Sequence, residues 1–140
     1  MTERDEQFAI AARQFADYLT AQTGVDLCPS LDGDEASLRA SFAQLDIALA
    51  QISDLASVYG SDPRRDIEPL TVPTAVLVGE LLRTGMGARW MEPAYEGDSS
   101  LMLVTRDGVA LDLDGVARTA LMSTQPNLSA LLNRLLEVEP

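Results

Sequence analysis

Hydrophobic side chains follow helical spacing along residues 3–59. Over residues 3–22 they recur at intervals of three and four, which predicts an amphipathic helix that ends at Gly24. Over residues 35–59 they form a narrower stripe, typical of a coiled-coil seam, made of Leu38, Phe42, Leu45, Leu49, Ile52, Ala56 and Tyr59. The seam has two possible uses: an antiparallel hairpin with the first helix, or a homodimer paired through residues 38–59.

Polar and proline-rich stretches separate these helices from the rest of the chain. Residues 25–35 carry proline, glycine and clustered acids, which predicts a loop. Residues 60–69 are polar with two prolines, and we expect a connector there. A third helix is then predicted to open at residues 71–73, because proline is tolerated in a first turn. Gly85 and Gly87 end it.

The pattern changes after Gly87 to short apolar runs with turn signals between them. Residues 88–94, 100–105 and 108–113 predict three strands, with turns at 96–100 and at the pair Asp107-Gly108. A short helix to about Met122 and a final amphipathic helix from Leu128 follow. The fold class is therefore α+β, as one domain over residues 1–140. Residues 1–70 hold the helical hairpin and connector; residues 71–140 hold the third helix, a three-stranded antiparallel meander and two C-terminal helices.

The charge balance limits the partners of such a domain. The chain has 22 acidic residues against 10 basic ones, all arginine, and a net charge of −12. That charge repels phosphate groups, so we expect no nucleic-acid partner and a protein partner with a basic surface. No apolar run approaches the roughly 20 residues of a membrane span. The acidic start MTERDEQF is also unlike a secretion signal. We expect a cytoplasmic protein without membrane contact.

Missing residue types remove several kinds of chemistry. The chain has no histidine, no lysine and a single cysteine, Cys28, which removes imidazole-dependent triads, Schiff bases and thiolate zinc sites. The acids of LDLDG (111–115) and of the cluster Asp32, Asp34 and Glu35 are too few for a calcium loop. We therefore expect no metal and no cofactor. The glycines of GMGARW (85–90) follow a helix rather than a strand, so they are not a dinucleotide-binding loop.

Glu80 is the acid that stands out, because it lies at the edge of the apolar face of the third helix. Arg83 is three residues further on, a spacing that favours an ion pair. The other interpretation is a glycoside-cleaving acid, which needs a second carboxylate nearby, with Glu92 or Asp112 as candidates. The ion pair is favoured, since charge pairs on helix flanks are far commoner than acid pairs in clefts.

Trp90, the only tryptophan, opens the first predicted strand. Its large apolar area makes it a natural centre for a small core, which is the favoured interpretation. If it were exposed, Trp90 would instead form a binding surface with its neighbours Arg89 and Met91, beside Glu80.

The segments VGELL (78–82) and GARW (87–90), followed by short strands and two helices, resemble an uncharacterised bacterial domain family with a "YLGE…GxxW" signature. The resemblance covers about residues 72–136; Leu77 and Val78 stand where the family has an aromatic residue and leucine. It implies that Gly79, Glu80, Gly87 and Trp90 form one junction between the third helix and the first strand. It implies no catalytic residue, and some small acidic proteins of this appearance are thought to be accessory or immunity proteins of bacterial toxin and secretion systems.

Three functions follow from these observations. The first is a non-enzymatic, acidic protein-binding domain, of accessory or immunity type in its narrowest form. The second is a carboxylate-based hydrolase with Glu80 as general acid. The third is a homodimeric helical scaffold. We expect the first, and no enzymatic activity.

Overall fold

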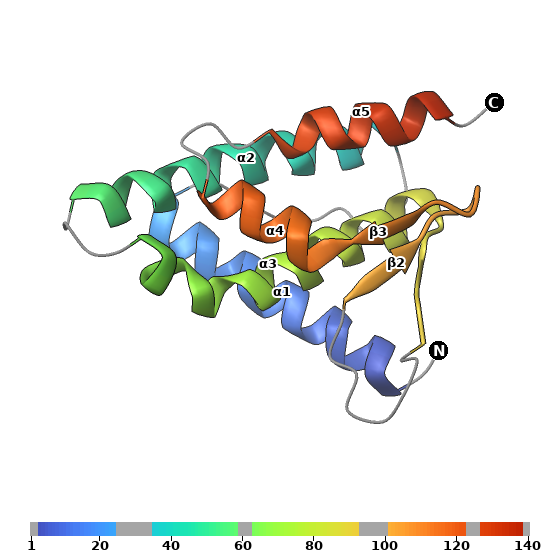
Figure 1. Ribbon diagram of the computed structural model, residues 1–140, viewed down its shortest axis with the longest axis horizontal. Helices are drawn as coiled ribbons and strands as arrows, with labels where there is room; N and C mark the ends of the chain where they lie inside the picture. Colours follow the sequence, from blue (N-terminus) through green and yellow to red (C-terminus); the bar gives the residue numbers. More distant parts are fainter. Residues whose placement is uncertain (1–2, 25–34, 59–62, 93–100, 123–126, 139–140) are drawn as a thin grey trace.

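The computed structural model of the protein describes residues 3–24, 35–58, 63–92, 101–122 and 127–138. In these ranges the chain forms α1 (Glu3–Thr23), α2 (Glu35–Val58), α3 (Pro63–Met86), β1 (Arg89–Trp90), β2 (Met102–Val104), β3 (Ala110–Asp112), α4 (Leu113–Met122) and α5 (Leu128–Val138). This arrangement confirms the α+β fold class with helices at both ends of a small sheet (Figure 1). No helix in the described ranges is both long enough and apolar enough to cross a membrane.

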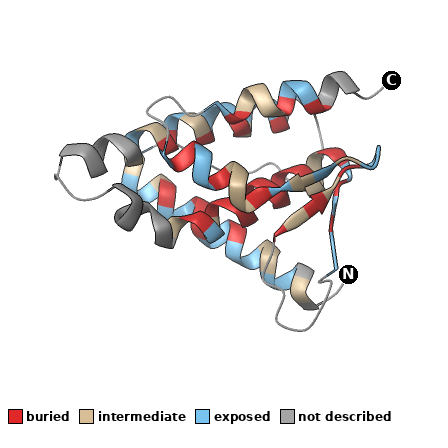
Figure 2. Cartoon of the chain, in the orientation of Figure 1, coloured by how far each residue is buried: buried red, intermediate tan, exposed pale blue. Residues whose placement is uncertain are grey.

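The central element is α3, which packs against α1, α2, α4 and β1. Its stretch from Thr74 to Leu82 is buried without interruption, and Figure 2 shows the surrounding helices turning their buried faces toward it. α5 lies on α2 at the opposite side of the molecule from α1 (Figure 1). Buried residues from all five helices and from the sheet belong to one hydrophobic core.

The start of α3 differs from the predicted one. The helix begins at Pro63, so residues 63–69 continue it and are not a connector, and the division of the chain at residue 70 falls inside a helix. Pro63 suits a first turn, where its missing N–H has no helical partner to lose. Pro69 and Pro73 lack the backbone N–H that would donate a helical hydrogen bond. Because they are four residues apart, the two missing hydrogen bonds lie on the same side of the helix, and those on the other sides can form.

The first half of the α2 seam, from Leu38 to Leu49, lies inside the monomer. Leu38, Phe42, Leu45 and Leu49 are between 0% and 4% exposed, and α2 uses this face against α3, α4 and α5, with a smaller contact to α1. This part of the seam is therefore covered within the monomer, and a homodimer paired through residues 38–59 stays a prediction. The main neighbours of α2 are α3 and α5, so the expected hairpin of the first two helices is only a minor contact.

The sheet is an antiparallel meander in the order β1-β2-β3, with strands shorter than predicted. Its β2–β3 turn confirms the Asp107-Gly108 signal, although the strands end further from the turn than predicted, at Val104 and Ala110. The N–H of Gly108 donates to the carbonyl of Thr105 at 3.0 Å, and Gly108 has a φ of 89°, which glycine adopts without strain. The predicted turn at 96–100 and the loop at 25–34 with Cys28, Asp32 and Asp34 lie outside the described residues.

Candidate functional site

Glu80 and Trp90 meet where α3 leads into β1. The chain reverses at Gly87, whose φ is 73°, and this turn brings Trp90 back alongside α3. The indole Nε1–H of Trp90 donates to Oε2 of Glu80 at 2.9 Å. Both residues are buried: Glu80 is 5% exposed and Trp90 is 8% exposed. The bond gives the indole N–H the partner that a buried tryptophan needs.

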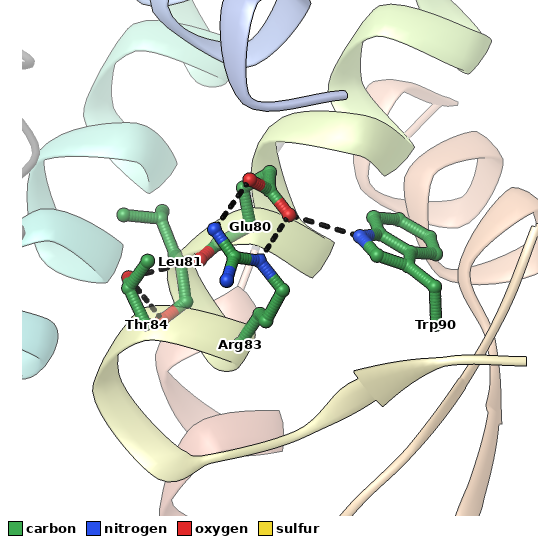
Figure 3. A network of polar contacts seen from close by, with 5 residues as sticks. All are labelled: Glu80, Leu81, Arg83, Thr84 and Trp90. Atoms are coloured by element: carbon green, nitrogen blue, oxygen red, sulfur yellow. Dashed lines mark hydrogen bonds and ion pairs between the residues drawn. The ribbon is translucent and has the colours of Figure 1, made fainter. Parts of the chain in front are cut away.

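Arg83 holds the same carboxylate from the next turn of α3. Its Nε donates to Oε2 of Glu80 at 2.8 Å and its Nη2 donates to Oε1 at 3.0 Å, a two-pronged ion pair (Figure 3). The side chain of Arg83 is 27% exposed, so the arginine of this ion pair reaches solvent while its acid is buried. Glu80 thus accepts three hydrogen bonds, from one neutral and two charged donors, which is a stabilising environment for an ionised carboxylate. The predicted i,i+3 pair is present.

Glycine at position 79 allows the close approach of the indole. A Cβ built there would lie 2.8 Å from Cδ1 of Leu113 and still closer to Cη2 and Cζ2 of Trp90. On its other side Trp90 contacts Phe8 of α1, with ring centroids 4.6 Å apart and planes inclined by 52°. Trp90 is therefore fixed between two helices, and its role is that of a core anchor.

The positions flanking Trp90 differ from it in exposure. Arg89 is exposed and Met91 is 42% exposed, whereas the binding interpretation of Trp90 required an exposed indole. That interpretation is wrong for Trp90 itself, because both the face and the N–H of the ring are already in contact with the protein. The backbone carbonyl of Met91 accepts a hydrogen bond from Nη2 of Arg4 at 2.8 Å, which ties the start of α1 to this strand.

The junction that the family resemblance implied is present in part. Gly79, Glu80 and Trp90 are in contact, and Gly87 makes the turn that joins them. A Cβ at Gly87 would come within 3.0 Å of Nη2 of Arg106, so the β2–β3 turn also reaches this corner. The contacts explain the residue types at these positions by packing alone. Membership of the family stays a prediction.

A groove of about 530 Å³ runs between α1 and α3, beside the junction. Its apolar part includes Ile10, which is 59% exposed, with Leu77 and Leu81 of α3. Its charged groups come from both helices: Arg13, Asp17, Glu80 and Arg83. A volume of this size is in the range of sites that receive a small molecule or several side chains of a partner.

The acid pair needed for a hydrolase is not arranged as predicted. Glu80 lines the α1–α3 groove, but neither Glu92 nor Asp112 does. Asp112 lines a second groove of about 620 Å³ between β3, α4 and α5, and its Oδ1 accepts the N–H of Gly115 at 3.3 Å, as an N-terminal cap of α4. The carboxylate that shares the groove with Glu80 is Asp17, which no local sequence pattern singles out.

Metal ligands do not gather in the part of the chain that the structure describes, where no group of three or more Asp, Glu or Cys side chains could hold an ion.

The sequence did not predict two of the sites that the structure shows. One is the α1–α3 groove itself. The other is Asp46 of α2, whose carboxylate accepts the N–H groups of Leu128 at 2.6 Å and Ser129 at 3.1 Å and so caps α5 from another helix. Neither has a local sequence signal, since both join residues far apart along the chain.

No protein-family model, no curated protein and no solved structure matches the chain.

Proposed function

We propose that the protein is a non-enzymatic protein-binding domain and that the groove between α1 and α3 is its contact surface. The observation that carries the proposal is the exposed Ile10 at the groove, which apolar side chains of α3 and charged side chains of both helices also line. An apolar centre with a polar rim is the usual composition of a protein interface.

The bonding of Glu80 supports a binding role over a catalytic one. Both carboxylate oxygens accept hydrogen bonds from Arg83, and Oε2 also accepts one from Trp90. A general acid must present its carboxyl oxygen to a substrate within hydrogen-bond reach. Glu80 would first have to give up contacts that hold β1 against α3, so we assign it to the support of the groove floor.

The overall charge favours a partner with a basic surface. At a net charge of −12 the chain attracts cationic proteins over about 30 Å in 0.01 M salt and over about 10 Å in 0.1 M salt, so added salt weakens this attraction. Residence in the cytoplasm and an accessory or immunity role in a bacterium belong to the same proposal; the second rests on the family resemblance alone.

Affinity capture from a lysate of the source organism, at low and high salt, tests the proposal. Ile10→Asp is compared with Ile47→Asp, because Ile47 is 50% exposed on α2 and lies outside the groove. We expect a stoichiometric partner with wild type and Ile47→Asp, and its loss with Ile10→Asp. Equal capture by both variants, or a partner lost with Ile47→Asp alone, would place the contact elsewhere.

A further inference from the structure

Four charged side chains line the α1–α3 groove, and they divide into two kinds. Glu80 and Arg83 pair with each other. Arg13 and Asp17, both exposed on α1, form no ion pair with each other and no hydrogen bond to the described residues. They lie four residues apart, about 6 Å along the helix axis. Their order, base before acid, is the weaker one for pairing within a helix. The groove therefore offers one positive and one negative side chain whose backbone positions lie one helical turn apart.

The shape of the groove favours a helix as its occupant. The residues contributed by α1 include Ile10, Arg13 and Asp17, at intervals of three and four, and span about 12 Å from Ala9 to Asp17. An apolar groove on a protein surface commonly binds an amphipathic helix, which lays its apolar face into the groove. An extended peptide would find no strand edge among the lining residues, all of which belong to α1 and α3, and its backbone groups would lack partners there.

We infer that the partner presents an amphipathic helix with an acidic and a basic side chain one turn apart, the acid opposite Arg13 and the base opposite Asp17. Apolar residues on the same face of this helix would contact Ile10 and Leu81. The inference rests on the proposed protein-binding function and adds the chemistry of the partner. The two arginines and two acids of the groove have no net charge, so the groove recognises its partner helix by the order of the charges. The net charge of the whole chain acts earlier, on the approach of the partner.

The order of charges can be reversed without changing the net charge. The variant Arg13→Asp with Asp17→Arg keeps the composition of the chain, and both positions are exposed, so we expect the fold to be kept, with circular dichroism as the check. The probe is a displayed library of 16-residue helical peptides in which two turns of one face are randomised. Peptides are selected separately on wild type and on the reversed variant, and each is then tested against Ile10→Asp and Ile47→Asp.

We expect wild type to enrich peptides with an acid and a base four residues apart, and the reversed variant to enrich the opposite order. The peptide selected on wild type should bind wild type about tenfold more tightly than the reversed variant, which corresponds to about 1.4 kcal/mol from two partly exposed ion pairs. The preference of the other peptide should be smaller, because the reversed order, acid before base, pairs better within the helix. Peptides that depend on Ile10 but show the same charges on both targets, or that contain proline and do not form a helix, would overturn the inference and leave the binding function standing. A selection without any Ile10-dependent peptide would overturn both.

Discussion

Replacing Glu80 with glutamine removes the charge of the central acid and keeps its shape. The carboxylate accepts hydrogen bonds from Nε and Nη2 of Arg83 and from Nε1 of Trp90. A glutamine has one acceptor oxygen, and its NH2 group would face at least one of these N–H donors. Because Trp90 is 8% exposed, its indole N–H has little access to water if the bond is lost.

The expected cost follows from these contacts. Removing one partner of a buried ion pair costs about 3–5 kcal/mol, and a hydrogen bond to a charged group contributes about 1.5–3 kcal/mol. Arg83 is 27% exposed and regains part of its hydration, so the lower end applies. We expect Glu80→Gln to lower the free energy of unfolding by about 3 kcal/mol, of which about 1.5 kcal/mol belongs to the bond from Trp90.

Urea denaturation followed by far-ultraviolet circular dichroism measures this change, and a double-mutant cycle with Trp90→Phe isolates the indole contact. The phenylalanine variant loses packing in both backgrounds, so the difference between backgrounds reports the coupling. We expect a coupling energy of about 1.5 kcal/mol. A Glu80→Gln variant as stable as wild type, or strictly additive effects, would refute the assignment of Glu80 as the acceptor that fixes β1 on α3.

Three further substitutions test other parts of the structure. Gly79→Ala gains about 1 kcal/mol of helix propensity but forces a methyl group against the fixed Trp90 at a cost of about 1–3 kcal/mol, and we expect a net loss of up to about 2 kcal/mol in urea denaturation. Asp46→Ala removes the cap of α5, and we expect the free energy of unfolding to fall by about 1–2 kcal/mol. Relative to wild type, amide hydrogen exchange should accelerate more in α5 than in α3. Gly108→Ala has open space around its new methyl group but a φ of 89°, so we expect a purely conformational cost of about 1–2 kcal/mol in thermal unfolding, without loss of the partner.

Local patterns predicted most elements, because helical spacing and turn residues act over a few positions. The apolar stripe of α1 and the stop at Gly24 are confirmed: its φ is 75° and its N–H donates to the carbonyl of Thr20 at 2.9 Å. The start of α3 was predicted wrongly. Two prolines and a run of polar residues favour a connector between Pro63 and Leu70 when the sequence is considered locally, yet this segment is helical. The later part of that helix packs at the centre of the core, and a short stretch of sequence does not show which helix will be central.

The candidate site was predictable only in part for the same reason. The spacing of Glu80 and Arg83 is local, and their ion pair was expected. The bond from Trp90 joins residues 10 apart across a chain reversal, and the groove needs α1 beside α3, which are separated by the whole of α2. The use of the α2 seam could not be decided either, because a seam has the same spacing whether it meets its own chain or a second copy.

Photo-crosslinking in the source organism tests the central claim, that the α1–α3 groove is a protein contact, most directly. A photoreactive amino acid replaces Ile10 in one variant and Ile47 in the other, both at exposed positions of helices, and the products are identified by mass spectrometry. We predict a crosslink from position 10 to one protein, through a helical segment of it, and none to that protein from position 47. No crosslink at position 10, or the same products from both positions, would contradict the claim.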